Sequence, residues 1–399
     1  MKNMYYVGGR QSDLVADFKA TTNDNFFRGS ITIKGSGQDG NISYESVSGT
    51  EVDETRIYFK ENIKIIKKFV KQQTKKIVKS DPDAMFIPYS FFWQDKIPKK
   101  FRCRVRCCND FDLLKYLNSK FNFKELIEGH LPQAPHVYLK GTEVIANIES
   151  GKWPSEYECA VQTEYGSGGN GTWLVTKDFD KEKILSELNP GETYVVGDFI
   201  HNLASVGIQV QLSNNEVAVY PAGIQLMRGP HYIGTDIYAF TQLPEDAQKE
   251  CIEVGKKFGQ ILKGLPQKPR GFVGLDLIVA KEGSPRVFAV ETNARFTGST
   301  GLLNILSHKA GIGSVFEHTY RAFYDEETNL QALFDKISPT GIKRIVDGAS
   351  TFEEVTENIK SFNVHDDRER YKKYLKYKKK PSSKKKITKK SISKKTKKA

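Results

Sequence analysis

The segment Gly274–Arg295, with the sequence GLDLIVAKEGSPRVFAVETNAR, constrains the fold of this chain more than any other part. Two apolar runs, Leu275–Ala280 and Arg286–Thr292, flank a short polar turn near Gly283 and Ser284. Apolar runs of this length on either side of a glycine-containing turn are typical of an antiparallel β-hairpin. The sequence therefore predicts a hairpin whose two strands pair about that turn.

One face of this hairpin concentrates polar groups. Because strand side chains alternate between two faces, Glu291, Asn293 and Arg295 should project to the same side. Pairing about the turn sets Asp276 opposite Glu291 or its neighbour, and two facing carboxylates repel unless a cation lies between them. Asp276, Glu291 and Asn293 offer hard oxygen ligands, which suit Mg²⁺ or Mn²⁺ and do not suit zinc. The planar guanidinium of Arg295 suits phosphate oxygens. The alternative is an edge hairpin with ordinary surface charges.

A second hairpin is rich in glycine and predicts a phosphate-binding loop. Residues Gly166–Gly171 fit the pattern G-x-G-x-x-G, and the run Thr172–Thr176 that follows is β-branched and aromatic, so it reads as a strand. A dinucleotide-binding fingerprint would run into a helix. A Walker loop would continue with Gly-Lys-Ser/Thr, and a protein kinase would carry His-Arg-Asp and Asp-Phe-Gly downstream. What remains is a hairpin tip whose backbone amides fold over phosphates, with a glycine-rich surface turn as the alternative. The loop residues are Gly166, Ser167, Gly168, Gly169 and Gly171.

These features, in this order, resemble the ATP-grasp superfamily of carboxylate–amine ligases over about residues 110–320. The resemblance implies an α/β chain (an α+β ATP-grasp fold) with a small N-terminal α/β pre-grasp lobe and two grasp lobes that clamp ATP. It also implies ATP and Mg²⁺ (or Mn²⁺) as cofactors. The segments that carry it are the linker Asn118–Pro135, the glycine loop, the hinge strand Thr193–Ile200, the strand Ser205–Gln211, and Asp276 with the Glu-x-Asn-x-Arg motif Glu291–Arg295.

The resemblance assigns roles to individual residues on the nucleotide side. Gln162 stands where family members usually carry a lysine that reaches the phosphates, and its neutral amide supplies no charge. Asp198 stands where a glutamate commonly contacts the ribose, and Phe199 and Ile200 follow it on the strand that cups adenine. Asn293 and Arg295 are the implied catalytic residues.

On the acceptor side, the loop after Arg295 opens a helix expected over Leu302–Lys309, with Ser299 or Thr300 as its cap. Free amides at a helix N-terminus beside an arginine form an anion site. We therefore expect Gly298, Ser299 and Thr300 to hold the acceptor carboxylate, with simple capping as the alternative. By resemblance, Gln225 lies near the acceptor.

The chain divides by pattern into four parts. We expect an N-terminal α/β pre-grasp domain over residues 1–115, an ATP-grasp domain over 116–345, a C-terminal helix over 346–370 and a disordered lysine-rich tail over 371–399. Thr351 and Glu354 form a capping box for the C-terminal helix. Further expected elements are strands at Tyr5–Gly9 and Asp83–Tyr89, an amphipathic helix at Lys60–Lys79, a long loop or irregular hairpin at Gly35–Gly49, and helices at Asp180–Leu188 and Asp246–Lys263.

The net charge of +13 resides in the tail. Residues 371–399 contain 15 lysines and no acidic residue, so the first 370 residues carry a net charge of −2. Such a segment predicts disorder and electrostatic attachment to nucleic acid or another polyanion, with a solvated solubility tail as the alternative. An apolar run long enough to span a membrane is absent from the sequence, so we expect no membrane partner.

The five cysteines indicate a reducing compartment. Their count is odd, and the N-terminal residues lack the apolar core of a secretion signal. We therefore expect a cytoplasmic protein, with the lysine-rich tail as a nuclear address in the alternative. Cys103, Cys107 and Cys108 could be argued as a thiol metal cluster, but buried strand cysteines are the preferred interpretation.

The predicted activity is an ADP-forming ligation, in which a small-molecule carboxylate is activated as an acyl phosphate and joined to an amine. Two alternatives stay open: a kinase of the same fold, and a nucleotide-binding scaffold with weak catalysis that its basic tail anchors to a polyanion. The replacement of lysine by Gln162 favours the scaffold, whereas the complete set of Asp276, Glu291, Asn293 and Arg295 opposes it.

Overall fold

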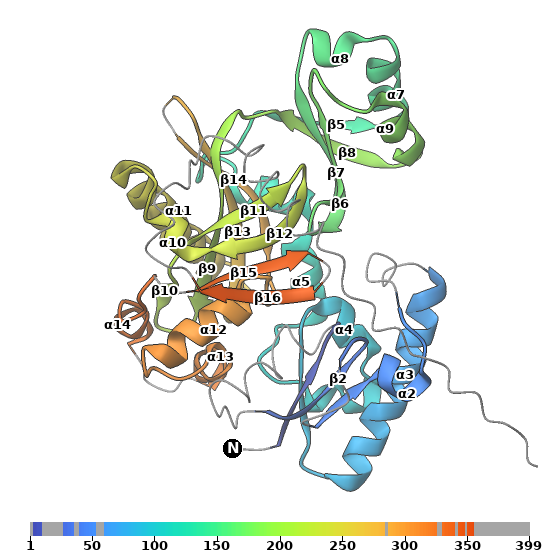
Figure 1. The fold of residues 1–399 in the computed structure, drawn as a ribbon, viewed down its shortest axis with the longest axis vertical. Helices are drawn as coiled ribbons and strands as arrows, with labels where there is room; N and C mark the ends of the chain where they lie inside the picture. The colour runs from blue at the N-terminus through green and yellow to red at the C-terminus, as the bar shows by residue number, and fades with distance from the viewer. Residues whose placement is uncertain are drawn as a thin grey trace, which may run out of the picture. The chain divides into compact units, whose positions relative to one another are not determined.

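A computed structural model describes residues 3–9, 27–35, 40–52, 60–283, 286–324, 329–339, 342–347 and 349–354, with backbone alone for 60, 61 and 342–354. All of these residues belong to one compact unit, Met1–Phe362, and the second unit is Asn363–Ala399. The described part combines helices with one parallel and two antiparallel sheets (Figure 1). This confirms the predicted α/β class.

The N-terminal lobe is a parallel sheet in the order β3-β2-β1-β4. The long helix α3 (Lys60–Ser80) buries Ile66, Phe69 and Val70 in the core of this lobe, together with Val7 and Phe86. The strands are β1 (Met4–Val7), β2 (Phe27–Thr32), β3 (Asn41–Ser43) and β4 (Met85–Pro88).

Both predicted strands and the predicted helix of this lobe are confirmed, but one expectation is wrong. Within the segment expected as a loop, the described residues form β3 and the short helix α2 (Tyr44–Ser48). The side chain of Asn41 donates to Ser30 Oγ and Thr32 Oγ1, at 2.8 Å each, and so fixes β3 against β2.

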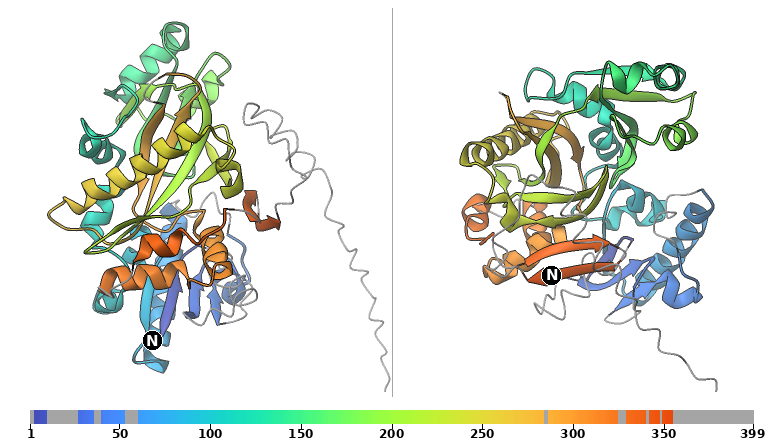
Figure 2. Two further views of the ribbon diagram at one scale, coloured as in Figure 1. Left: turned by 90° about the vertical axis from the view of Figure 1, so that its left-hand side faces the viewer. Right: turned by 45° about the horizontal axis from the view of Figure 1, so that its top comes forward.

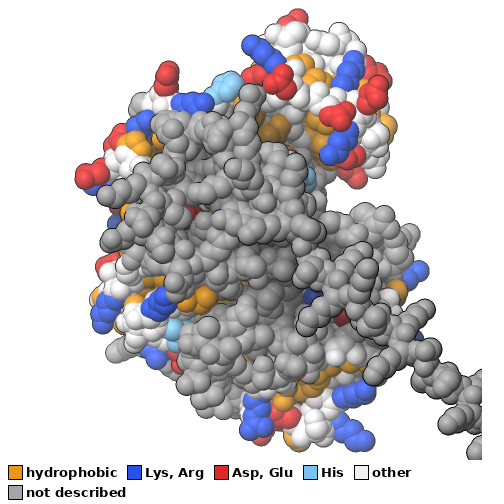
Figure 3. All heavy atoms as spheres, in the orientation of Figure 1, with side chains coloured by type: hydrophobic (Ala, Val, Ile, Leu, Met, Phe, Trp, Pro, Cys, Tyr) orange, Lys and Arg blue, Asp and Glu red, His pale blue; other side chains and the backbone are white. Residues whose placement is uncertain are grey.

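The glycine loop belongs to a small antiparallel sheet in the order β5-β8-β6-β7. Helices α7 (Gly141–Glu149) and α9 (Lys181–Glu187) contribute Val144, Ile148 and Ile184 to its core. On the face in Figure 3, basic and acidic side chains are interspersed over this lobe. The strands are β5 (His136–Lys140), β6 (Cys159–Ser167), β7 (Asn170–Val175) and β8 (Thr193–Asp198).

The predicted metal-binding hairpin forms one edge of a large sheet in the order β14-β13-β9-β11-β12-β15-β16, with β10 paired to β9. Helix α11 (Glu245–Lys263) lies along this sheet (Figure 2). The strands are β9 (Asn202–Leu212), β10 (Val217–Val219), β11 (Gly223–Arg228), β12 (His231–Asp236), β13 (Gly271–Ala280), β14 (Val287–Asn293), β15 (Ile342–Asp347) and β16 (Ala349–Glu354).

Side chains along β9 point alternately to the hydrophobic core and to the face of the sheet that carries the candidate site. Its even-numbered residues from Val206 to Leu212 are apolar and fully buried, and a Cβ on Gly255 of α11 would lie 2.7 Å from Ile208 Cδ1. Its odd-numbered residues face the other way, where helix α13 (Val315–Tyr324) donates a hydrogen bond from Thr319 to Gln211. The second face therefore carries the polar groups.

The expected domain boundaries do not follow the elements. The boundary at 115/116 falls inside α5 (Phe111–Asn118), and the boundary at 345/346 falls inside β15. The expected C-terminal helix is wrong over Ala349–Glu354, which forms β16 and pairs with β15 across a hairpin. Strand pairing therefore overrides the local capping pattern. Residues 355–370 of that helix and the whole tail lie outside the described residues.

Within the described ranges, no helix combines the length and the apolar character needed to cross a membrane.

Candidate active site

The structure brings the two predicted carboxylates together on β13 and β14. Asp276 pairs directly with Glu291 in the antiparallel register, as the sequence predicted. The amide Nδ2 of Asn293 donates to Asp276 Oδ2 at 3.0 Å and to Glu291 Oε1 at 3.5 Å. The Asn293 amide thus stands between the two carboxylates with its positive end toward both.

The electrostatics of this pair favour a cation. Burial raises the pKa of Asp276 to about 8, and the negative charge of Glu291 adds to the shift. Burial also acts to raise the pKa of Glu291, but the ammonium of Lys120 and the guanidinium of Arg295 outweigh it, so that pKa is lowered. One carboxyl therefore keeps its charge while the other tends to retain its proton, as expected for two buried carboxylates that face each other.

These residues fit a hard divalent cation. The two facing carboxylates provide oxygen donors of the kind that Mg²⁺ prefers, and the Asn293 oxygen, which accepts from Arg295, would join them if the amide turned over. A cation here would replace the Asn293 amide hydrogens as the positive partner of both carboxylates. Gln225 on β11 also donates from Nε2 to Asp276 Oδ1 at 2.9 Å, so the carboxylate is held from two sides.

Arg295 connects this hairpin with the glycine loop. Its Nη2 donates to Asn293 Oδ1 at 2.5 Å and to Ser167 Oγ at 3.0 Å, although Ser167 lies 128 residues earlier in the chain. Its Nη1 donates to the carbonyl of Phe296 at 3.1 Å, and its guanidinium lies 5.8 Å from the ring centre of Tyr89. Two segments that the sequence singled out separately therefore meet at one guanidinium.

The tip of the glycine loop is a tight turn that only glycine adopts easily. Gly168 and Gly169 have φ values of +62° and +89°, and Ser167 pairs with Asn170 across them. This is the positive-φ geometry of a two-residue hairpin turn. A Cβ on Gly169 would collide with the carbonyl of Pro230 in the turn between β11 and β12. The loop therefore rests directly against the large sheet.

Lys120 is a site residue that the sequence analysis missed. It begins helix α6 (Lys120–Ile127), is 4% exposed, and its Nζ lies 3.0 Å from Glu291 Oε2. The same Nζ is 3.3 Å from the position that a Cβ would take on Gly166. Lys120 thus places a positive charge between the glycine loop and the carboxylate pair. Gln162, by contrast, donates to Thr172 Oγ1 at 3.3 Å within its own hairpin.

The sequence does contain a signal for Lys120. Lys120, Phe123, Lys124 and Ile127 follow the spacing of one buried helical stripe, and all four are buried. Lysine rarely occupies such a stripe unless its charge has a partner. Two lysines on the apolar face of one helix therefore point to a buried acid elsewhere in the chain.

Because Lys124 is buried, we expect the free energy of unfolding to depend on pH. Its side chain is 5% exposed, its Nζ lies 3.5 Å from the carbonyl of Ala289, and burial lowers its pKa to about 8 despite the opposing charge of Glu291. Between about pH 8 and 10.4 the unfolded chain binds the proton more tightly than the folded one, so stability rises with pH across this window, by about 1–3 kcal/mol. Urea titrations of Lys124→Met should lose this rise. The matched exposed variant Lys115→Met should keep it, and an unchanged rise in Lys124→Met would contradict the assignment.

The residues predicted for the nucleoside lie on the connection between the two antiparallel sheets. Asp198 ends β8 of the small sheet, and its Oδ1 accepts a hydrogen bond from the hydroxyl of Tyr157. The backbone N–H of Phe199 donates to the carbonyl of Glu158 at 3.0 Å. Ile200 follows, two residues before the start of β9 in the large sheet. Their role toward ATP stays a prediction.

The predicted acceptor loop leads into helix α12 (Thr300–Lys309), but its capping differs from the expectation. Ser299 precedes the helix without a side-chain capping bond, and its Oγ instead lies 2.9 Å from Thr297 Oγ1. Thr300 Oγ1 accepts from the backbone N–H of Thr297 at 2.9 Å. Gly298 has no room for a side chain because the ring of Tyr232 packs against it. The loop is therefore held by its own hydroxyls.

A buried glutamine beside this loop was also missed. Gln209 on β9 is 3% exposed, and its Oε1 has no hydrogen-bond partner within the part of the chain that the structure describes. That oxygen lies 2.9 Å from the position that a Cβ would take on Gly274, and Thr297 Cγ2 lies 2.7 Å from it. A side chain at position 274 would therefore displace both residues.

The cysteines do not form a metal cluster among the residues that are described. All five are free thiols: Cys103 is exposed, Cys107 and Cys108 lie in an irregular segment, Cys159 is buried on β6 and Cys251 is buried on α11. The expectation of buried strand cysteines is wrong for Cys103, Cys107 and Cys108, because none of the three lies on a strand and of them Cys107 alone is buried.

Comparisons with known proteins bear on the fold. No family model matches the sequence, and no curated protein matches it. Biotin carboxylase from Campylobacter jejuni is similar in structure, with a TM-score of 0.57, 14% identity, and coverage of 86% of this chain and 75% of that one. Carboxyaminoimidazole ribonucleotide synthase from Aspergillus clavatus, complexed with ATP, gives a TM-score of 0.55 and 15% identity over 83% of this chain and 79% of that one.

Phosphoribosylamine–glycine ligase from Thermotoga maritima gives a TM-score of 0.53 and 14% identity over 86% of this chain and 79% of that one. At such identities the likeness concerns the fold. The chain therefore has the ATP-grasp fold.

Proposed function

We propose that this protein is an ATP- and Mg²⁺-dependent, ADP-forming ligase that joins a small-molecule carboxylate to an amine. One observation carries the proposal: the facing carboxylates of Asp276 and Glu291 connect through Asn293 and Arg295 to Ser167 of the glycine loop. Carboxylates for a metal, an arginine for phosphate oxygens and a closing loop are the parts that phosphoryl transfer requires.

In the proposed reaction, a carboxylate oxygen attacks the γ-phosphorus of ATP, and the bond to the β,γ-bridging oxygen breaks as ADP leaves. An amine then attacks the acyl carbon, the bond to the phosphorylated oxygen breaks, and phosphate leaves as the amine loses a proton. Mg²⁺ held by Asp276, Glu291 and Asn293 would neutralise the phosphates and align them.

The protein's own residues supply the rest. Arg295 stabilises the equatorial oxygens as charge spreads over them, because its fork can bind two oxygens at once. Lys120 adds a second cation beside Gly166, where the loop amides face the phosphates. The loop shields the reactive acyl phosphate from water. The charge that Gln162 on β6 does not supply would therefore come from Lys120 at the start of α6, and this weakens the case for a non-catalytic scaffold.

The proposal also assigns individual residues to the nucleoside, the phosphates and the acceptor carboxylate. Asp198, Phe199 and Ile200 would bind the nucleoside, and Gly166, Ser167, Gly168, Gly169 and Gly171 the phosphates. Gly298, Ser299 and Thr300 would bind the acceptor carboxylate near Gln225. Attachment of the tail to nucleic acid or another polyanion stays a prediction, as does the cytoplasmic or nuclear location, because residues 371–399 lie outside the described part.

The test measures ADP and inorganic phosphate together. Purified full-length protein receives Mg-ATP with pooled carboxylic acids and pooled amines, and a parallel sample contains EDTA. Equal release of ADP and phosphate that depends on both pools and is lost with EDTA supports the ligase. ADP without phosphate would indicate a kinase. Neither product, despite measurable ATP binding, would leave the scaffold as the better explanation.

A further inference from the structure

Helix α3 of the N-terminal lobe presents a dense row of positive charge to solvent (Figure 1). Seven lysines between Lys64 and Lys79 are exposed, and no acidic residue occurs in the sequence from Asn62 to Ser80. The apolar residues of the helix, among them Ile66 and Val70, are buried in the core of the lobe. Lysine therefore occupies seven of the ten exposed positions of α3 that the structure describes.

A second long helix of the chain carries a different charge pattern. Helix α11 has four lysines and four acidic residues, and Lys256 Nζ lies 2.9 Å from Glu253 Oε1. On α3, lysines that lie one turn apart, such as Lys67 and Lys71, repel each other instead. The outer face of α3 therefore holds a repulsion that an external anion would relieve.

A short helix beside α3 adds to this charge. It is η2 (Lys99–Arg104), with the sequence KKFRCR. The carboxylate of Asp95 lies where η2 and α3 meet, and its oxygens are 3.5 Å from Lys67 Nζ, 3.2 Å from Lys96 Nζ and 3.2 Å from Arg102 Nη2. One negative charge among three positive ones leaves this junction cationic. The exposed face of α3 together with η2 is called the basic surface below.

The charge of the chain outside its tail is divided between two parts. Residues 60–106 contain 14 basic and four acidic residues, a net charge of +10. Because the first 370 residues sum to −2, the other 323 of them carry a net charge of −12. Such a separation of charge within a part that is nearly neutral as a whole indicates a surface for a polyanion.

The residues of α3 favour a nucleic-acid duplex among the polyanions. Lys64 and Lys79 lie about 22 Å apart along the helix at 1.5 Å per residue. Over that length a duplex offers about 13 phosphates, whereas an extended acidic peptide offers about six carboxylates. Single strands are bound by aromatic side chains on which bases stack, and Phe69, the one aromatic residue of α3, is buried. An anionic bilayer is disfavoured because the apolar face of the helix is buried in the lobe.

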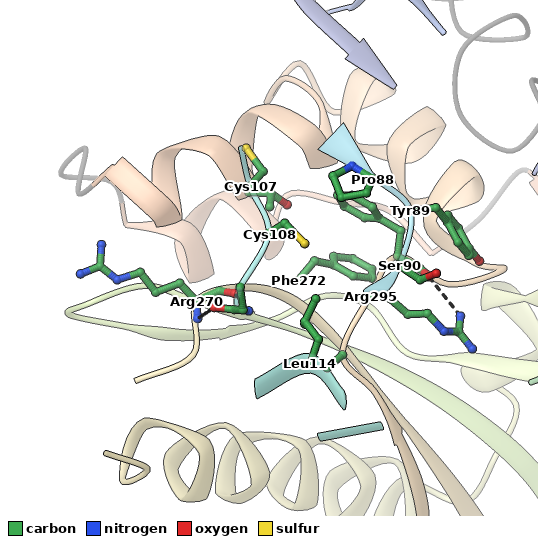
Figure 4. Close-up of a pocket in the computed structure, with 13 residues that line it drawn as sticks. Pro88, Tyr89, Ser90, Cys107, Cys108, Leu114, Arg270, Phe272 and Arg295 are labelled. Atoms are coloured by element: carbon green, nitrogen blue, oxygen red, sulfur yellow. Dashed lines mark hydrogen bonds between the residues drawn. The ribbon is translucent and has the colours of Figure 1, made fainter. Parts of the chain in front are cut away.

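The basic surface is distinct from the candidate active site. The chain continues from η2 to Cys107 and Cys108, which line a small cavity beside Arg295 (Figure 4). This cavity has room for about one water molecule, so it does not admit a polyanion. A bound duplex is therefore expected on the outer face of the lobe.

We propose that the basic surface binds double-stranded nucleic acid through its phosphates and without sequence preference. Each lysine that contacts a phosphate releases counterions from the duplex, so binding weakens steeply as salt rises. Lysine meets phosphate as a point charge and reads no base edges, so the sequence of the duplex has little influence. The surface consists of residues other than those of the lysine-rich tail.

The test measures the binding of a labelled 25-base-pair duplex of arbitrary sequence to the full-length protein by fluorescence anisotropy, from 50 to 200 mM NaCl. Replacement of Lys68, Lys71 and Lys75 by glutamine removes three exposed charges from α3. The Kd at 100 mM NaCl should rise at least tenfold, and the dependence of log Kd on log salt should fall by about 2 to 3. The melting temperature should not fall, because the substitutions remove repulsion between like charges.

The matched control replaces Lys249, Lys256 and Lys257 of α11 by glutamine, which removes three exposed lysines from a helix of similar length. Its Kd should stay within about twofold of the native value. The tail is intact in every sample, so a difference between the two triple variants reports α3. Equal Kd values for the two variants would assign the binding to the tail and overturn the inference. Absence of binding at 50 mM NaCl, tighter binding of a single strand of the same length, or stronger competition by polyglutamate than by unlabelled duplex would also overturn it.

Discussion

Glu291→Gln should lower turnover by about 10²- to 10³-fold, the cost typical of losing one preorganised electrostatic group in a transition state. Glutamine keeps the shape of the side chain and an oxygen that can still accept from Lys120, 3.0 Å away in the native chain. It removes the negative charge that faces Asp276 and that a divalent cation needs. The measurement is steady-state ADP release at saturating Mg-ATP, with the melting temperature recorded for each sample.

The matched control is Glu282→Gln, because Glu282 is exposed at the turn of the same hairpin. It should retain full turnover. Lys120 is 4% exposed, so some loss of stability in Glu291→Gln is expected from its weakened ion pair. Normal turnover in a folded Glu291→Gln protein would remove Glu291 from the mechanism. Equal losses of turnover in both variants would show that the loss comes from disturbing the hairpin and not from removing the charge of Glu291.

Arg295→Lys should lower kcat by about 10²-fold while ATP binding is largely preserved. In the structure one nitrogen of the guanidinium contacts both Ser167 and Asn293, and the other contacts the carbonyl of Phe296. Lysine keeps the charge, but a single ammonium cannot reproduce a planar fork that binds several oxygens. Single-turnover phosphoryl transfer and equilibrium binding of Mg-ATP, measured on the same preparation, separate the two effects.

Arg286→Lys provides the control at the other end of β14, which Arg286 directly precedes. Arg286 donates from Nη1 to Asp246 at 2.9 Å on the surface, away from the carboxylate pair. Exposed pairs of this kind contribute little, so the substitution should change neither kcat nor ATP binding. If Arg295→Lys retained normal kcat, Arg295 would act as a structural link between the glycine loop and the hairpin, and its role toward phosphate would be withdrawn.

The two hairpins could be predicted because their patterns are local. A strand repeats every two residues, and a glycine-containing turn fixes where pairing begins, so the sequence sets Asp276 opposite Glu291 or its neighbour. A register shift between Asp276 and Leu277, seen only in the structure, makes Glu291 the partner. The same reasoning gives a hairpin tip within Gly166–Gly171, and the structure locates the turn at Gly168 and Gly169, which have positive φ. The amphipathic helix α3 likewise follows from its own periodicity.

The errors arose where pairing with another strand competes with the preference of the local sequence. Thr351 and Glu354 form a good capping box, but Ala349–Glu354 gains a hydrogen-bonded partner in β15 and becomes a strand. The segment around Asn41 is rich in loop-forming residues, yet its pairing with β2 makes it the edge of the parallel sheet. In both places the strand depends on a neighbour that local composition does not reveal.

The sequence by itself determined the chemistry of the site: which carboxylates face each other, which arginine shares their face and which glycines form the loop. Only the tertiary structure decided what joins them, namely that Arg295 reaches Ser167 and that the ammonium of Lys120 lies between the glycine loop and Glu291. The physical reason is the distance along the chain over which each interaction acts. Strand and turn geometry act over a few residues, whereas these contacts join segments that folding brings together from more than a hundred residues apart.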